Sequence, residues 1–206
     1  MSVSTRVRFA RSRQWLATLR HYHEISGVGE MVRRYFALNA FDGALTTLGI
    51  LAGGYIGGVR NGRTLVLVGA TTALAMAVSG FYGSYLVEKA ERRRSLRELE
   101  ESTLTSLKDT DIGAASRYAT VVIAAADGAS PAVAAAIAFT PFVFAAWIGI
   151  EMAYLLGGLL CLLECFLLGV FLGRVSKDRL ILSGLKLVFA GILLLVLSLL
   201  LEMGIR

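Results

Sequence analysis

The sequence predicts an all-α, polytopic membrane protein with about five transmembrane helices and a short cytosolic helical insertion after the second. Hydrophobic residues make up 56% of its 206 residues, and the mean hydropathy is +0.67. Charged residues make up only 17%, whereas soluble domains carry about 25%. Several apolar stretches approach or exceed the roughly 20 residues that cross a bilayer. We therefore expect an integral protein of the cell membrane with the lipid bilayer as a partner.

We predict spans at 35–58, 64–88, 131–149, 152–173 and 180–203. Region 118–173 fits either two helices with a short lead-in or three very short ones, because its only charges are Asp127, Glu151 and Glu164. The basic residues decide between these counts. Segments 1–34 and 89–118 each carry seven Lys or Arg, and loop 174–179 carries three. Placing all of them in the cytoplasm requires two crossings after 118, with the N-terminus cytoplasmic and the C-terminus outside.

Residues 1–34 form a basic N-terminal arm in this scheme. The arm has no apolar core of a cleavable signal. Apolar residues interleave with its arginines, which favours an amphipathic helix on an anionic membrane face, although a disordered basic tail is the alternative. The basic residues lie between apolar segments, so we do not expect nucleic-acid binding. His21, His23 and Glu24 fit surface decoration better than a site.

Segment 89–130 is the strongly polar insertion. Its first part has the composition of an exposed helix growing out of the second span, and Asp109–Gly113 interrupts that helix. Residues 114–126 are expected to pack at the membrane surface. Pro131 is expected to open the third span, because proline is favoured in a first helical turn. Asp-Gly occurs at both 42–43 and 127–128, which is weak support for an internal duplication.

Asp42 is the sharpest functional signal, because it lies inside the first span with Asn39 and Thr46 one turn away on either side. A carboxylate within a bilayer needs a partner or water, and commonly marks an ion path or a proton relay. Oxygen ligands suit hard divalent cations. The structural alternative is an Asp that caps a broken helix or bonds to a neighbour.

A row of acidic residues continues the second span: Glu88, Glu91, Glu98 and Glu101. The first three fall within about one quarter of the helix circumference, so the row could collect cations. Interleaved arginines favour instead a salt-bridged, solvated helix.

Glu164 lies near the middle of the fourth span and needs a partner or a polar cavity. Lys186 in the fifth span is a candidate partner, and we predict that Asp42 and Glu164 form a proton relay. Glu151 is expected at the turn before the fourth span. Cys161 and Cys165 fit buried small thiols. The glycines of the first two spans favour close helix packing, with a narrow pathway as the alternative. No catalytic triad, phosphate loop or zinc ligand set is evident, so we predict neither an enzyme nor a cofactor.

The segment RRYFALNAFDGALTTLGILAGGYIGG resembles the first helix of the vacuolar iron transporter family. AMAVSGFYGSYLVEKAERR resembles the family's second helix and its cytosolic extension. SPAVAAAIAFTPF resembles the start of the third helix, and LLGVFLGRVSKDRLILSGLKLVFAGILLL the last two. The resemblance covers about 33–203.

This resemblance implies a homodimer with a pathway near its interface, and export of Fe²⁺ or Mn²⁺ from the cytoplasm in exchange for protons. Asp42 matches the family's membrane-embedded aspartate. The acidic row matches the start of its cytosolic metal-binding glutamates, although the insertion here is shorter, as in a prokaryotic or archaeal branch.

Two positions of the second helix depart from the family. Members often have Ser-Met and Gly-Glu-Tyr, whereas this chain has Ser79-Gly80 and Gly83-Ser84-Tyr85. Loss of the thioether should shift selectivity toward harder cations. The function expected from the sequence is therefore divalent metal transport, with metal ligands among Asp42, Asn39, Thr46, Glu88, Glu91, Glu98 and Glu101. The alternatives are a structural or regulatory membrane protein with this fold, or a transporter of another solute.

Overall fold

The computed structural model describes residues 17–205, which are helical with short connections and contain no strand. The long helices are α2 (Val28–Ile56), α3 (Gly62–Thr103), α4 (Asp111–Val143), α6 (Ile150–Ser176) and α7 (Leu180–Ile205), and the short α5 (Ala145–Ile148) joins α4 to α6. A further helix covers 17–26. Five helices are long and apolar enough to cross a membrane. The predicted fold class, an all-α polytopic membrane protein, is confirmed.

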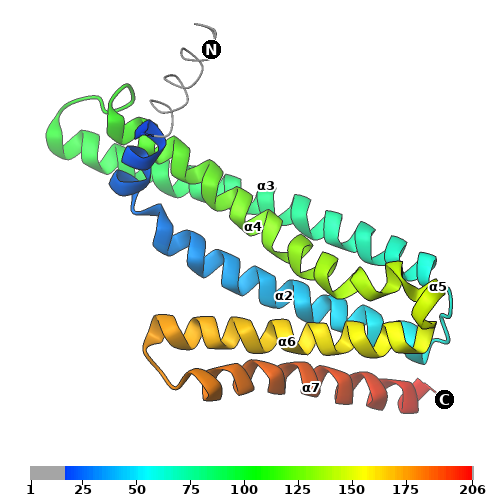
Figure 1. The fold of residues 1–206 in the computed structure, drawn as a ribbon. Helices are drawn as coiled ribbons and strands as arrows, with labels where there is room; N and C mark the ends of the chain where they lie inside the picture. Colours follow the sequence, from blue (N-terminus) through cyan, green and yellow to red (C-terminus); the bar gives the residue numbers. More distant parts are fainter. Residues whose placement is uncertain (1–16, 206) are drawn as a thin grey trace, which may run out of the picture.

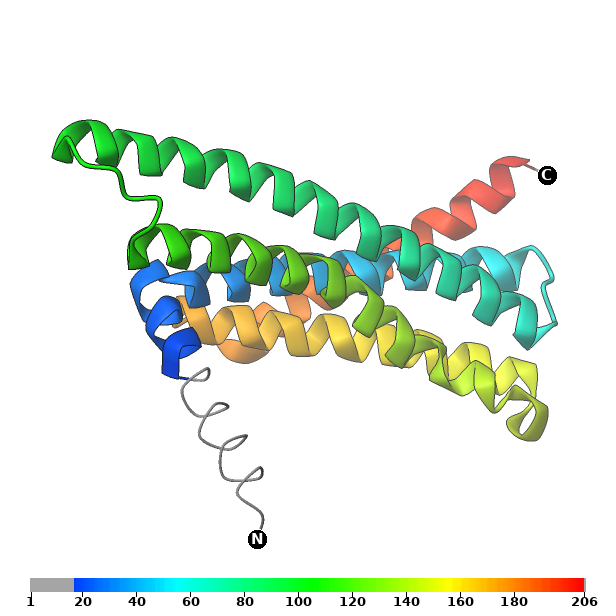
Figure 2. The same ribbon diagram turned by 90° about the horizontal axis from the view of Figure 1, so that it is seen from above.

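Helix α2 lies between two helix pairs, α3 with α4 and α6 with α7 (Figure 1). It packs mainly on α4 and α6, whereas α3 packs almost entirely on α4. The 17–26 helix lies across the end of the bundle where α2 begins, and α7 ends at the opposite end (Figures 1 and 2). The first and last described helices thus lead to opposite ends of the bundle, which fits an odd number of membrane crossings.

Small residues set the distances between these helices. A Cβ added to Gly43 of α2 would lie 2.6 Å from the Cα of Pro131 in α4. A Cβ on Gly69 of α3 would lie 2.1 Å from the ring of Phe139. At Gly43 only glycine avoids a clash with backbone, and at Gly69 any larger residue would displace the Phe139 ring. The packing interpretation of the glycines is confirmed at both positions.

The third helix begins at Asp111, so the predicted start at Pro131 is wrong. Thr110 caps the helix, because its Oγ1 accepts a hydrogen bond from the backbone N–H of Gly113 at 3.5 Å. Pro131 lies inside the helix, where it cannot bond the carbonyl of Asp127. The hydroxyl of Ser130 donates to that carbonyl instead, at 3.0 Å. The local hydroxyl lets the helix run through a residue that usually breaks it.

The predicted insertion 89–130 consists of continuations of α3 and α4 rather than a separate unit. Helix α3 has 42 residues, about 63 Å at 1.5 Å per residue, which is roughly twice the hydrocarbon thickness. The predicted outgrowth of the second span is therefore confirmed, and it ends at Thr103. Residues 114–126 do not spread on a surface, because α4 buries one face of this stretch against its neighbours, including Ala115, Ala119 and Ile123.

The arm is shorter than predicted, because α2 starts at Val28 rather than at residue 35. Val28 is fully buried in a cluster with Ala119 and Ile123 of α4, which explains the early start. The 17–26 helix also contacts α4, through the rings of Tyr22 and Tyr118. Most of the predicted amphipathic arm, residues 1–16, lies outside the described residues.

Candidate functional site

Asp127 is a buried carboxylate at the midpoint of α4, with sixteen residues of the helix on either side. It is only 6% exposed. One carboxylate oxygen accepts a hydrogen bond from the Asn39 amide of α2, and the other accepts one from the Ser84 hydroxyl of α3. Asp127 thus connects three helices, and both of its oxygens have a donor, as a buried carboxylate requires.

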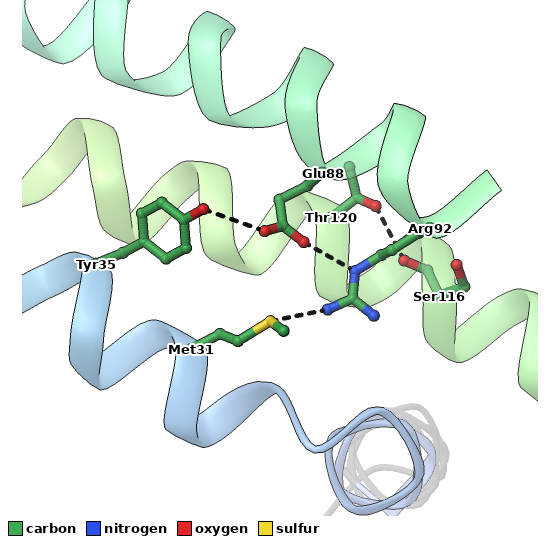
Figure 3. A network of polar contacts seen from close by, with 6 residues as sticks. All are labelled: Met31, Tyr35, Glu88, Arg92, Ser116 and Thr120. Atoms are coloured by element: carbon green, nitrogen blue, oxygen red, sulfur yellow. Dashed lines mark hydrogen bonds and ion pairs between the residues drawn. The ribbon is translucent and has the colours of Figure 1, made fainter. Parts of the chain in front are cut away.

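Glu88 forms a second polar contact one helical turn beyond Ser84. It is 7% exposed. One oxygen accepts from the hydroxyl of Tyr35 at 3.4 Å, and the other accepts from Nε of Arg92 at 3.1 Å. The Arg92 guanidinium also reaches the Met31 sulfur of α2 at 3.6 Å (Figure 3). Glu88 therefore already has a cationic partner.

These two contacts form a polar ladder, by which we mean Tyr35, Asn39, Ser84, Glu88 and Asp127. Tyr35 and Asn39 occupy successive turns of α2, as Ser84 and Glu88 do on α3. The Asn39 amide also donates to the carbonyl of Tyr35 at 2.9 Å, which links the two rungs. The ladder carries hydrogen-bonding groups from the start of α2 toward its middle.

Two glycines allow the ladder to form. A Cβ on Gly80 of α3 would lie 3.2 Å from the Cα of Gly128, and a Cβ on Gly128 would lie 2.5 Å from the carbonyl oxygen of Ala77. The backbones of α3 and α4 are therefore nearly in contact beside Asp127. That close approach brings the Asp127 carboxylate within reach of Ser84. The ladder thus depends on these two glycines, and on Gly128 most of all, where an added Cβ would clash with backbone.

Asp42 differs from the ladder residues, because its side chain is exposed on the surface of the protomer, as is that of Thr46. It sits at the midpoint of α2, with fourteen residues of the helix on either side. Among the described residues it makes no hydrogen bond or ion pair. The three residues predicted on one face therefore separate: Asn39 serves Asp127, and Asp42 and Thr46 face outward.

The acidic row also divides. Glu88 alone is buried. Glu98 is exposed and pairs with Arg94 at 3.0 Å, which is the expected arrangement of a solvated, salt-bridged helix. Glu91 and Glu101 are exposed, with no hydrogen bond or ion pair to the described residues. The row is therefore not one site.

A cavity of about 270 Å³ opens beside the Glu88 rung. The 17–26 helix, α2, α3 and α4 all contribute to its lining, which includes Met31, Glu91 and Ser116. The thioether of Met31, the carboxylates of Glu88 and Glu91 and the guanidinium of Arg92 line this space. The cavity gives the ladder an opening at the end of the bundle where α2 begins.

Helix α6, the fourth long helix, carries Glu151 and Glu164. Glu151 lies in the first turn of α6, as predicted, and pairs with Arg60 at 3.2 Å. Glu164 has two buried carboxyl oxygens, and neither has a hydrogen-bond partner in the described residues. The suggested pair with Lys186 is not formed: the lysine is exposed, and the Glu164 oxygens are buried without a partner among the described residues. Cys161 and Cys165 are free and buried.

No group of three or more His, Cys, Asp or Glu side chains within residues 17–205 is placed to hold a metal ion. The reason is that the acidic side chains of α2, α3 and α4 point in different directions. Asp127 faces inward, Asp42 faces outward, and Glu88 is paired with Arg92. The predicted metal ligands therefore do not meet within one protomer.

Asp127 was not predicted as a site residue, although it is central to the ladder. The usable signal was the repeated Asp-Gly dipeptide at 42–43 and 127–128. The predicted third span began at 131, which left Asp127 outside the membrane. An error in a helix boundary therefore concealed a buried carboxylate.

Comparison with known proteins attaches no activity to this chain. No family model matches it. An uncharacterized protein of Methanocaldococcus jannaschii is 29% identical over 177 residues, which cover 84% of this chain and 90% of that protein. The similarity therefore extends through the bundle.

Proposed function

We propose that this protein transports a divalent metal cation, Fe²⁺ or Mn²⁺, out of the cytoplasm in exchange for protons. The observation that carries the proposal is Asp42, an unpaired carboxylate at the midpoint of a membrane-spanning helix and on its exposed face. An ionised carboxylate against lipid is unfavourable by several kcal/mol or more. It needs water, a cation or another protein surface, and a carboxylate with a neighbouring hydroxyl is a hard-cation ligand.

A homodimer is the second part of the proposal. Two copies that meet through this face of α2 would bring two Asp42 and two Thr46 side chains together, which supplies the ligands that one protomer lacks. Gly53 lies on the same face, three turns after Asp42, and a Cβ there would meet nothing within 4 Å. A small residue with free space beside it permits close approach of a second helix.

The cavity beside Glu88 fits the entry of such a path. Its carboxylates and thioether can attract a divalent cation, and the polar ladder leads from Glu88 toward the middle of α2. Arg92 then acts as an internal cation that an entering metal must replace at Glu88. The resemblance of the first two helices to the vacuolar iron transporters supports the same assignment.

The test is metal flux into proteoliposomes for Fe²⁺, Mn²⁺, Co²⁺, Zn²⁺ and Ca²⁺. We expect flux of Fe²⁺ or Mn²⁺ for the native chain and none above empty vesicles for Asp42→Asn, because the amide keeps the shape but has no charge. Asp109→Asn is a matched control, because Asp109 is an exposed aspartate in the connection between α3 and α4. Native-like flux in Asp42→Asn would remove Asp42 from the mechanism.

The dimer has its own test. Gly53→Leu adds a side chain where the protomer has space, so the variant should fold as well as the native chain but shift to monomers in mass measurements of detergent and lipid samples. A native chain that is already monomeric in lipid contradicts the dimer.

A structural or regulatory role without transport is the second candidate. It is favoured by the full hydrogen bonding of Asp127 and by the lack of a metal-holding group within the described residues of one protomer. Absence of flux for every cation in the panel, with a folded dimer, would select this role.

A further inference from the structure

Glu164 is a buried carboxyl group without a polar partner, close to the middle of α6. Fourteen residues of the helix precede it and twelve follow. Neither of its oxygens has a hydrogen-bond partner in the described residues, and both are shielded from solvent. This situation is the reverse of that of Asp127, whose two oxygens each accept a hydrogen bond.

The surroundings of Glu164 are apolar. Its titratable neighbours are the thiols of Cys161 and Cys165 on the same helix, both fully buried. At this level α2 and α4 pack against α6 with Ala44 and Ala134, and α7 contributes Leu187 and Val188. Neither carboxyl oxygen of Glu164 bonds to a charged or polar group of the described residues.

These surroundings decide which form of the carboxyl is stable. Ionised, the group would leave two charged oxygens without donors in a low-dielectric environment, a penalty that amounts to several kcal/mol after relaxation. Protonated, it loses only the hydrogen bonds of a neutral group, which costs about 1–3 kcal/mol in proteins. A cation would remove the penalty as well, but Lys186 does not reach it. The closed bundle therefore holds Glu164 in its protonated form.

Glu164 also lies at the depth of Asp42. Its neighbour Cys165 packs against Ala44, which is two residues from Asp42 in α2, or about 3 Å along the helix axis. Asp42 is exposed on α2, whereas Ala44 is buried in the cluster with Cys165 of α6. A shift of α2 relative to α6 would thus change the surroundings of both carboxyl groups together.

We propose that Glu164 is the proton-carrying group of the transport cycle, with α2 between it and the metal at Asp42. When the contact between α2 and α6 opens to cytoplasmic water, the O–H bond of Glu164 breaks and the proton passes to water. When the contact opens to the other side, the carboxylate takes a proton from water there. This inference rests on the proposed function for its place in transport, but the protonated state stands on the burial alone.

The first experiment measures that state directly, with the full chain in liposomes and N,N′-dicyclohexylcarbodiimide as the probe. The reagent accepts the carboxyl proton on one nitrogen while the carboxylate oxygen bonds to its central carbon, and the adduct rearranges to a stable N-acylurea. We expect an adduct on Glu164 at neutral pH that diminishes as the pH rises. Glu164→Gln should abolish it, and the exposed Glu151 should carry none.

The second experiment separates a proton carrier from a merely structural glutamate. Glu164→Gln keeps the size and neutrality of the protonated side chain, so the variant should fold and bind metal. We expect metal-driven proton counterflow, followed with a pH-sensitive dye inside the vesicles, to be lost. Glu151→Gln on the same helix should keep it.

The outcomes distinguish this inference from the proposed function. A native chain that moves no metal overturns the proposed function, while labelling of Glu164 still supports its protonated state. Metal flux with normal proton counterflow in Glu164→Gln overturns the proton-carrying role and leaves the transporter intact. Labelling that is absent at every pH overturns the protonated state.

Discussion

Two Asp-Gly dipeptides lie at the midpoints of α2 and α4 and behave in opposite ways. In both, the glycine packs against another helix, Gly43 against Pro131 and Gly128 against Ala77. The aspartates differ, because Asp127 turns inward to two donors and Asp42 turns outward to none. The same dipeptide therefore builds a structural junction in one helix and leaves a free carboxylate in the other.

The difference has a physical origin in the neighbouring helices. α4 is enclosed by α2, α3 and α6, so a carboxylate at its midpoint must face protein. α2 packs mainly on α4 and α6 and makes few contacts with α3, which leaves one of its faces open. The two residues are of the same type, so it is hydrogen bonding that distinguishes them. Asp127 stabilises the fold, whereas Asp42 is free to bind a transported cation.

The largest expected effect concerns what the two dipeptides share. Gly43→Leu and Gly128→Leu should each prevent a folded protein from accumulating, because an added Cβ would lie 2.6 Å or less from backbone atoms of another helix. The measurement is the yield of monodisperse protein after purification. Gly83→Leu is the matched control, since a Cβ there meets nothing within 4 Å. Normal yields for the first two variants would show that the helices can separate.

The next prediction tests the contrast between the aspartates. Asp127→Ala leaves the Asn39 amide and the Ser84 hydroxyl without an acceptor, so we expect the free energy of unfolding to fall by about 2–5 kcal/mol. Asp42→Asn should not change it, because Asp42 has no partner to lose within the protomer. Thermal unfolding of both variants in one detergent is the measurement. Equal melting temperatures for the two would remove the distinction.

The next prediction concerns Glu88, a buried carboxylate that is paired with Arg92. Arg92→Gln removes the charge beside the buried Glu88, which should lower stability by about 3 kcal/mol. Added Mn²⁺ should restore part of the loss, since a divalent cation can take the vacated position, and should stabilise the native chain less. Melting temperatures with and without Mn²⁺ decide the matter. If the ion has the same effect on both chains, Glu88 is not a cation site.

The sequence predicted the fold well because long apolar segments and basic loops are strong signals. Five spans and the outgrowth of α3 follow from hydropathy and charge alone. The boundary at Pro131 failed because the Ser130 hydroxyl, which bonds the carbonyl freed by the proline, cannot be recognised without the helix geometry. Asp42 could be found from its position in an apolar run, whereas the role of Asp127 depends on a contact between residues 39 and 127, which are distant in the chain.

The sequence also could not show which glutamate of the acidic row is buried. Four glutamates at helical spacing appear equivalent in sequence, but only Glu88 falls where α2 and α4 cover α3. Glu91 is exposed at the cavity beside Glu88, and Glu98 and Glu101 are exposed further along α3. Burial is a property of the assembled bundle, so composition could not separate one ligand candidate from three surface charges.

The smallest expected effect therefore belongs to the exposed glutamates. Glu91→Gln combined with Glu101→Gln removes two charges that have no bonds to the described residues. Exposed charges in high dielectric interact by about 0.2–1 kcal/mol and are screened by salt. We expect unchanged stability and a rise of about twofold in the half-saturating metal concentration, corresponding to about 0.4 kcal/mol, which disappears at high ionic strength.

Glu98→Gln, which only breaks the exposed pair with Arg94, should have no effect on either quantity and serves as the control. Titration of metal flux at low and high salt makes the comparison. A rise of tenfold or more that persists at high salt would identify the pair as direct ligands, and the exposed end of α3 would then belong to the metal path together with the buried Glu88.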